Sequence, residues 1–352
     1  ANAVYREVIA RYLGQNYQDN IPAPEFVWQR PDGSLDMDAL MDGYFPLSFP
    51  EERAHLNGWE TSIVRREPDR IVTQRSRPRA GGREWEPRVG VYYAADPPTR
   101  GLDPAKLGLP AEPAEFEPLE GVKPADTGPE GFRRVMELMG DDGLVGVRLA
   151  STKALHNEED VYRYYDHPEE HGRWAAERLE AVERRFELLN AMDVRPDFFC
   201  VGSSGTLVTQ TVEIFRQLCL PAVKRAIELA GSVGIPTHLH SCGPERELVR
   251  IMAEETALTV IDPLEVPPMG DCDLAELKRR WGARLTLKGN LHTTDVMLRG
   301  TPETVAAACR GAIDDAAEGG RFILSTGDQC GRDTPDENLF AMVETAREYG
   351  KY

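Results

Sequence analysis

Long apolar runs are missing from this chain. No stretch approaches the ~18 consecutive apolar residues that a membrane-spanning helix needs, and the first residues lack the apolar centre of a secretion signal. We therefore expect no membrane segment, no export signal and a cytoplasmic location.

Positive charge is also scarce. The chain has 41 Lys and Arg against 59 Asp and Glu, which gives a net charge of −18 at pH 7. A surface that binds the nucleic-acid backbone needs clustered Lys and Arg. The composition therefore predicts no nucleic-acid partner.

Cysteines are few. The six cysteines are widely spaced between Cys200 and Cys330 in a chain of 352 residues. This pattern is typical of a reducing compartment and of one or two functional sites, and it excludes a disulfide framework.

The part of the chain beyond about residue 130 alternates short β-rich runs with amphipathic helical stretches, and such alternation predicts a parallel sheet. The expected strands are 144–149, 197–201, 236–240, 258–262, 284–288 and 322–326. The expected helices are 160–192, 212–232, 245–255, 273–281, 302–317 and 335–349.

The first 130 residues are less regular. We expect a helix at 3–14 and a strand at 21–28, and Pro68-Asp69 lies between two β-rich stretches, 62–67 and 70–75, that read as a β-hairpin.

Residues 95–129 are rich in Pro, Gly and Glu, which predicts a long surface loop or a lid-like insertion. The spacing of the strands favours a (β/α)8 TIM barrel. We therefore predict one domain over residues 1–352, with the hairpin and loop at 60–129 as an insertion.

A candidate metal site begins where a short apolar run ends, at Thr237-His238-Leu239-His240-Ser241-Cys242-Gly243. Residues two apart on a strand point to the same side, so His240 and Cys242 could bind one soft cation such as zinc. The alternative is a buried histidine beside an inert cysteine. His238 is expected to be a hydrogen-bonded core imidazole.

Two further residues follow predicted strands, at the end where barrel enzymes place their chemistry. Glu265 is a candidate fourth metal ligand or general base; alternatively, it caps the next helix. Asn290 could orient a substrate through its amide or satisfy loop backbone.

A glycine-containing loop follows the strand at 197–201. Gly202 and Ser203 could admit a ligand close to the backbone, but the spacing is not that of a phosphate-binding loop. Tight loop geometry is the simpler explanation.

The C-terminal half resembles the uroporphyrinogen decarboxylase superfamily, nearest its corrinoid-dependent methyltransferase branch. The motifs that carry this resemblance are His240-Ser241-Cys242-Gly243, Asp273-Leu274-Ala275-Glu276-Leu277-Lys278, Lys288-Gly289-Asn290-Leu291, Gly300-Thr301-Pro302-Glu303-Thr304-Val305 and Thr334-Pro335-Asp336-Glu337-Asn338-Leu339. They occur in the family's order over roughly residues 195–350.

The resemblance implies a TIM barrel and separates two activities. The arginine-rich motif by which decarboxylases hold the tetrapyrrole is missing around residues 26–33, and the family's Gly-Asp-Asp is replaced by Gly202-Ser203-Ser204-Gly205. His240 and Cys242, in contrast, match the zinc motif of methylcobamide:coenzyme M methyltransferases.

The third zinc ligand of that branch is a cysteine after the eighth strand. The corresponding position here is Asp328, and Cys330 follows two residues later. Either residue could complete the set, and a carboxylate would make the metal harder and more Lewis acidic.

The resemblance thus implies a zinc-dependent methyltransferase that moves a methyl group between a corrinoid (cobalamin) and a small thiol or a methoxylated or methylated substrate. The sequence contains no Asp-x-His-x-x-Gly signature of a corrinoid-binding domain, so we expect the corrinoid on a separate partner protein. A decarboxylase and a non-enzymatic corrinoid-binding or small-molecule-binding protein are the alternatives. A homodimer is the default expectation for the assembly.

Overall fold

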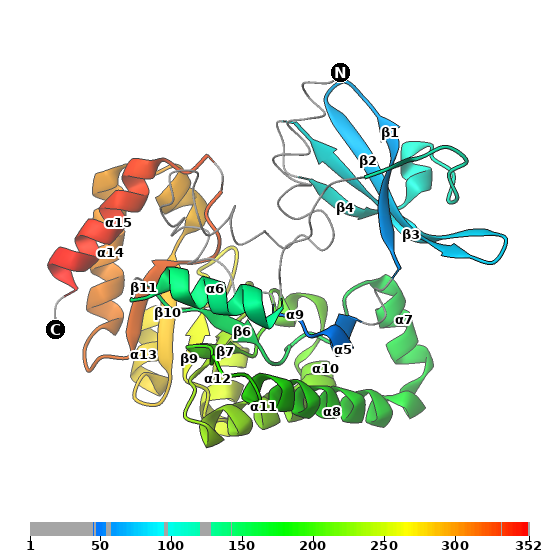
Figure 1. Ribbon diagram of the computed structural model, residues 1–352. Coiled ribbons are helices and arrows are strands. Elements are labelled where there is room, and N and C mark those ends of the chain that lie inside the picture. The colour runs from blue at the N-terminus through cyan, green and yellow to red at the C-terminus, as the bar shows by residue number, and fades with distance from the viewer. Residues whose placement is uncertain are drawn as a thin grey trace. The chain divides into compact units, whose positions relative to one another are not determined.

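The computed structural model (Figure 1) describes residues 45, 47–53, 58–94, 98–119, 128–141, 143–331 and 333–350. The chain divides into two compact units, residues 1–143 and 144–352. The helix expected at 3–14 and the strand expected at 21–28 lie outside the described residues. That residues 1–352 form one domain stays a prediction.

The first unit contains a five-stranded sheet in the order β4-β3-β2-β1-β5. Its strands are β1 (Glu60–Arg66), β2 (Arg70–Arg79), β3 (Gly82–Tyr93), β4 (Thr99–Leu102) and β5 (Glu117–Pro118). β1 pairs with β2 antiparallel across Pro68-Asp69, which confirms the predicted hairpin. Val72, Val89 and Val91 form its buried cluster.

The described part of this segment, residues 98–119 and 128–129, contains more secondary structure than a long loop would have. The expectation of one long loop was wrong for β4, for the short helix η3 (Pro104–Leu107) and for β5. β4 pairs with β3, and β5 pairs with β1, so both are edge strands. An edge strand leaves one row of N–H groups unpaired, and it therefore tolerates the prolines and glycines that made this segment read as a loop.

The second unit contains six parallel strands in the order β11-β10-β9-β8-β7-β6. They are β6 (Gly146–Arg148), β7 (Phe198–Cys200), β8 (Thr237–His240), β9 (Val260–Asp262), β10 (Thr286–Leu291) and β11 (Phe322–Thr326). All six predicted strands are present, so the α/β class with a parallel sheet is confirmed.

Helices connect these strands. The first unit holds α5 (Pro50–Arg53) and α6 (Pro129–Met139). The second holds α7 (Glu158–Asp166), η4 (Pro168–Glu170), α8 (His171–Asn190), α9 (Thr206–Thr209), α10 (Val212–Ile214), the π-helix η5 (Phe215–Cys219), α11 (Leu220–Ser232), α12 (Arg246–Glu255), α13 (Leu274–Trp281), the π-helix η6 (Thr293–Leu298), α14 (Pro302–Ala316) and α15 (Asp336–Tyr349).

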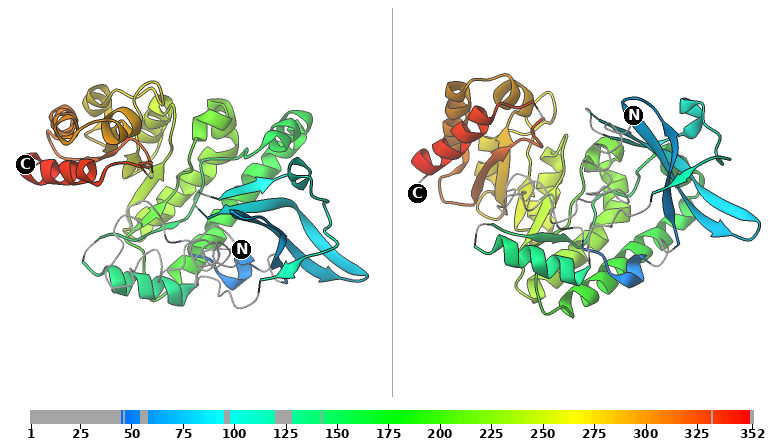
Figure 2. Two further views of the ribbon diagram at one scale, coloured as in Figure 1. Left: turned by 90° about the horizontal axis from the view of Figure 1, so that it is seen from above. Right: turned by 45° about the horizontal axis from the view of Figure 1, so that its top comes forward.

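The long helices of the second unit pack beside one another in chain order. α8 contacts α11, α13 contacts α14, and α14 contacts α15, as Figures 1 and 2 show. Because the six strands are parallel, their carboxyl ends all lie at the same end of the sheet. The loops that follow the strands therefore gather at one end.

Proline accounts for one departure from the predicted helices. The single helix expected at 160–192 is divided into α7, η4 and α8, and the division falls at His167-Pro168. Proline lacks the N–H that would continue the helix, and it disfavours helical backbone at the residue before it.

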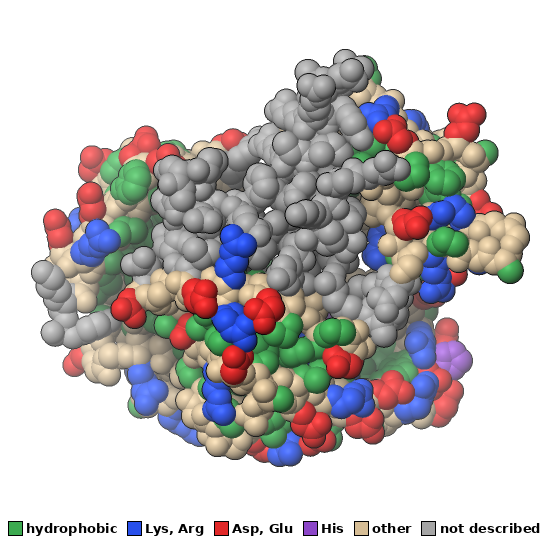
Figure 3. Space-filling view, in the orientation of Figure 1, with side chains coloured by type: hydrophobic (Ala, Val, Ile, Leu, Met, Phe, Trp, Pro, Cys, Tyr) green, Lys and Arg blue, Asp and Glu red, His purple; other side chains and the backbone are tan. Residues whose placement is uncertain are grey.

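None of the helices in the described residues is both long and apolar enough to cross a membrane. On the face seen in Figure 3, Lys and Arg side chains lie interspersed with Asp and Glu. Pairs such as Arg250 with Glu247 and with Glu254 on α12 are typical of this mixed surface.

Candidate metal centre

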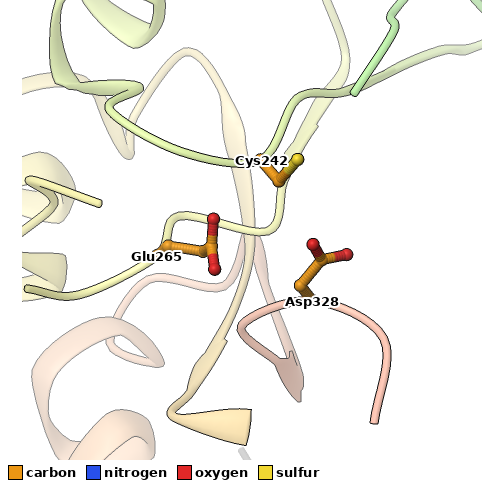
Figure 4. A group of neighbouring side chains, drawn as sticks. All are labelled: Cys242, Glu265 and Asp328. Carbon is orange, nitrogen blue, oxygen red and sulfur yellow. The ribbon is translucent and has the colours of Figure 1, made fainter. Parts of the chain in front are cut away.

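Three acidic side chains meet beyond the carboxyl ends of β8, β9 and β11. Cys242 lies two residues after β8, Glu265 three residues after β9, and Asp328 two residues after β11. One ligand atom from each, the thiol sulfur and two carboxylate oxygens, all lie within 4.8 Å of one another. Figure 4 shows the three side chains directed into the same space.

The structure thus brings together three of the predicted site residues. Of the two candidates for the ligand after β11, Asp328 belongs to the group and Cys330 does not, among the residues that the structure describes. His240, which was predicted as a metal ligand, is not a member of the group either, among the same described residues.

Local backbone geometry positions the group. Gly243 has φ +93°, a conformation that a residue with a side chain rarely adopts, so the chain turns directly after Cys242. The turn directs the N–H of Gly243 to Glu265 Oε2. In the loop after β11, Gly327 N donates to the carbonyl of Leu291 at 2.6 Å and Gln329 N donates to Asp328 Oδ1 at 2.8 Å.

The electrostatics of the group favour a cation. Burial raises the pKa of Glu265, the hydrogen bond from Gly243 lowers it, and the charge of Asp328 raises it again, so the pKa ends above its usual range. A divalent cation would relieve this repulsion between acidic groups.

The donor set fits zinc. Zinc accepts thiolate, carboxylate and imidazole ligands, and catalytic zinc sites have three protein ligands and one open position. Cys242, Glu265 and Asp328 supply one thiolate and two carboxylates.

Asp262, which the sequence reasoning did not single out, lies at the centre of a second polar cluster. His240 Nδ1 donates to Asp262 Oδ1 at 3.0 Å, while Lys288 Nζ lies 2.7 Å and His238 Nε2 lies 3.3 Å from Oδ2. The one feature that could have pointed to Asp262 is its place as an acidic residue at the end of the strand that pairs with the strand of His240. His238 is buried and polar, as predicted.

The pKa values in this cluster move in opposite directions. Burial lowers the pKa of His240, but hydrogen bonds with Asp262 and Cys242 outweigh it and raise the pKa to about 10. Burial raises the pKa of Asp262, but His238, His240 and Lys288 outweigh it and hold the pKa well below its usual range. Both shifts favour the charged form of the group concerned.

Two buried side chains hold the loop that carries Glu265. Asn290 Nδ2 donates to the carbonyl of Leu264 at 3.0 Å, and Leu264 N donates to Glu245 Oε2 at 2.8 Å. The amide of Asn290 thus satisfies loop backbone, which was one of the two roles expected for it. Glu245, a further residue that the sequence reasoning missed, is only 1% exposed.

Glu245 makes stability depend on pH. Burial raises the pKa of its carboxyl well above the usual value of 4.5, against the lowering effect of the hydrogen bond from Leu264. The folded state therefore holds this proton more tightly than the unfolded state. The resulting stabilisation is fully present below the unfolded pKa and is lost as the pH rises through the folded pKa.

We expect Glu245→Gln, which cannot ionise, to flatten this dependence and to stabilise the protein by about 1 kcal/mol at neutral pH. Urea unfolding of both proteins between about pH 5 and about pH 8 measures the effect. Exposed Glu115→Gln is the control and should match wild type. An unchanged pH dependence in Glu245→Gln would contradict the assignment.

Gly202 and Ser203, predicted to bind a cofactor, lie in the loop after β7. A Cβ atom on Gly202 would lie 2.3 Å from the carbonyl oxygen of His240 and 2.4 Å from its nitrogen, so this glycine lets two strand ends approach. Ser203 Oγ accepts from Arg148 Nη1 at 3.1 Å and pairs with Ser151 Oγ at 2.7 Å. Tight loop geometry explains Gly202, and the cofactor role of both residues stays a prediction.

Part of the chain is similar to a known protein family. Residues 198–349 match the family model for uroporphyrinogen decarboxylase (URO-D). This segment of the chain is similar to the uroporphyrinogen decarboxylase family. The resemblance predicted from the sequence is confirmed, and the matched segment runs from β7 to α15 and includes every candidate ligand of the metal centre.

Two relatives of the chain are methyltransferases. A methylcobamide:CoM methyltransferase (MtbA) from Methanosarcina mazei is 28% identical over 139 residues, or 39% of this chain and 37% of the relative. MtbA from Methanosarcina acetivorans is 28% identical over 137 residues, with the same coverage. The chain thus spans 37% of the length of the curated relatives that it matches.

The solved structure of a methyltransferase from Methanosarcina mazei is similar with a TM-score of 0.47 and 20% sequence identity, over 74% of each chain.

Proposed function

We propose that this protein is a zinc-dependent methyltransferase that moves a methyl group between a corrinoid and a small substrate, either a thiol or a methoxylated or methylated compound. The observation that carries the proposal is the convergence of Cys242, Glu265 and Asp328 beyond three strand ends. The similarity to two methylcobamide:CoM methyltransferases supports the corrinoid as methyl carrier.

In this proposal Cys242, Glu265 and Asp328 hold the metal, and His240 is the further donor beside them. Zinc, when bound, would lower the pKa of a thiol or polarise an ether oxygen. Glu265 is fixed through Oε2 by the N–H of Gly243. The buried amide of Asn290 fixes the loop before Glu265 and thereby limits the motion of this ligand.

The remaining expectations belong to the same proposal. A (β/α)8 barrel is supported by six parallel strands in sequential order. A corrinoid protein would dock over the ends of these strands. A cytoplasmic location, a homodimer and a ligand role for Gly202 and Ser203 are further predictions.

Uroporphyrinogen-type decarboxylation is the second candidate, and the structure offers it little support. It would need free arginines to hold carboxylate groups of the substrate. Three arginines that the sequence offers for this role are paired with glutamates: Arg75 with Glu86, Arg77 with Glu84, and Arg83 with Glu60. A fourth, Arg148, donates from Nη1 to the carbonyl of Gly202 and to Ser203 Oγ, both at 3.1 Å.

Methyl transfer can be tested in both directions with the full chain loaded with zinc. One reaction contains free methylcobalamin and a panel of small thiols; the other contains reduced cobalamin and methoxylated or methylated compounds. We expect zinc-dependent loss or gain of the methylcobalamin absorbance in one of them, and none with Cys242→Ser. Turnover in neither direction by a protein that holds about one zinc per chain would contradict methyl transfer.

A further inference from the structure

The parallel register of β8 and β9 places one carboxylate beside two histidines. His240 is paired with Asp262, and His238 is paired with Val260 two residues earlier. The side chain of Asp262 is therefore a direct neighbour of His240, and Oδ1 accepts from Nδ1 at 3.0 Å. Asp262 is only 5% exposed, so little water competes for this contact.

The neighbouring strand anchors the same carboxylate. Lys288 on β10 donates from Nζ to Oδ2 at 2.7 Å, and His238 Nε2 lies 3.3 Å from that oxygen. The two oxygens of Asp262 thus contact different partners: Oδ1 contacts His240, and Oδ2 contacts Lys288. Rotation of the carboxylate would break both contacts.

The contact with Asp262 fixes the orientation of the His240 ring. An imidazole that donates from one ring nitrogen to a carboxylate has its ring orientation fixed and its other nitrogen left for a ligand. Nδ1 of His240 is held by Asp262, so Nε2 is the nitrogen left free by this contact for another ligand.

We propose that Asp262 is a positioning residue that fixes His240 with Nε2 toward the metal centre, and that Lys288 fixes Asp262 in turn. The inference depends on the proposed function in one respect, namely that a metal binds at Cys242, Glu265 and Asp328. In the contacts described above, neither Asp262 nor Lys288 touches any of these three ligands.

Zinc affinity of the full chain provides the first measurement, by competition with a chromophoric chelator. Asp262→Asn keeps the shape of the side chain and removes its charge, and we expect zinc to bind about 10-fold to 100-fold more weakly. Lys288→Met should weaken it less, by about threefold. Glu169→Gln is the matched control, because Glu169 lies 3.2 Å from His167 Nδ1 in an exposed pair, and it should not change the affinity.

The orientation of His240 provides the second measurement, which needs neither metal nor activity. Long-range proton–nitrogen NMR of the metal-free chain should show a protected proton on Nδ1 of His240, assigned by its loss in His240→Gln. We expect this signal to disappear in Asp262→Asn and to weaken in Lys288→Met. A general loss of structure would instead disturb the whole spectrum. If Asp262→Asn does not fold, the signal of Lys288→Met is the test.

The outcomes separate this inference from the proposed function. A folded Asp262→Asn with unchanged zinc affinity, or with the Nδ1 proton still protected, overturns the positioning role. Wild-type protein that binds zinc but transfers no methyl group overturns the proposed function and leaves the inference standing. If wild type binds no zinc, the metal proposal fails, and the NMR signal alone decides whether Asp262 positions His240.

Discussion

Asparagine in place of Asp328 is expected to release the bound metal, whereas serine in place of Cys330 should leave it bound. Asp328 contributes a carboxylate oxygen within 4.8 Å of the ligand atoms of Cys242 and Glu265, and Cys330 is outside this group in the part of the chain that the structure describes. The substitution Asp328→Asn keeps the size of the side chain and removes its charge, so this variant isolates the ligand role.

The measurement is the zinc content of protein purified without chelator. Wild type and Cys330→Ser should contain about one zinc per chain, and Asp328→Asn about a tenth of that or less. The pair serves as its own control, since both residues lie on one loop. Loss of zinc from Cys330→Ser with retention in Asp328→Asn would reverse the ligand assignment and indicate a loop arrangement with two cysteine ligands.

Alanine in place of Gly202 is expected to destabilise the protein by about 3 kcal/mol. The added methyl group would lie 2.3 Å from the carbonyl oxygen and 2.4 Å from the nitrogen of His240. Both contacts are to backbone, which cannot move aside as a flexible side chain can. Relief requires the ends of β7 and β8 to separate, and that movement would also displace the first residues of the metal centre.

Urea unfolding followed by circular dichroism measures this loss of stability, and chelator competition measures the accompanying loss of zinc affinity. Gly172→Ala in α8 is the matched control: its Cβ meets nothing within 4 Å, so the variant should be neutral or slightly more stable. Wild-type stability in Gly202→Ala would show that this loop is looser than described. A loss of ligand binding without a loss of stability would instead favour the predicted cofactor role.

Much of the second unit follows from the sequence. The six strands were predictable because each is a short apolar run between longer amphipathic stretches, and this contrast is local. Helix starts were also local: Asp273 accepts from Glu276 N at 2.8 Å and Thr301 accepts from Thr304 N at 3.4 Å, and both caps could be read from the residue types.

The first unit was less predictable. The hairpin of β1 and β2 was predictable because its turn and the two β-rich stretches beside it lie within a few residues of one another. β4 and β5 are short edge strands that form because β3 and β1 offer open edges, a partnership between segments far apart in the chain. Their prolines and glycines predict a loop when the partner strand is not known.

By itself, the sequence determined the α/β class of the second unit, the strand ends at which chemistry was to be sought, and the candidates His240, Cys242, Glu265, Asp328 and Cys330. These follow from periodicity and from ligand chemistry, which are properties of neighbouring residues. The tertiary structure decided which of the candidates meet, because the loops after β8, β9 and β11 approach one another only when the parallel sheet forms. It also revealed Asp262 and Lys288, since an ion pair across adjacent strands depends on register and leaves no local pattern in the sequence.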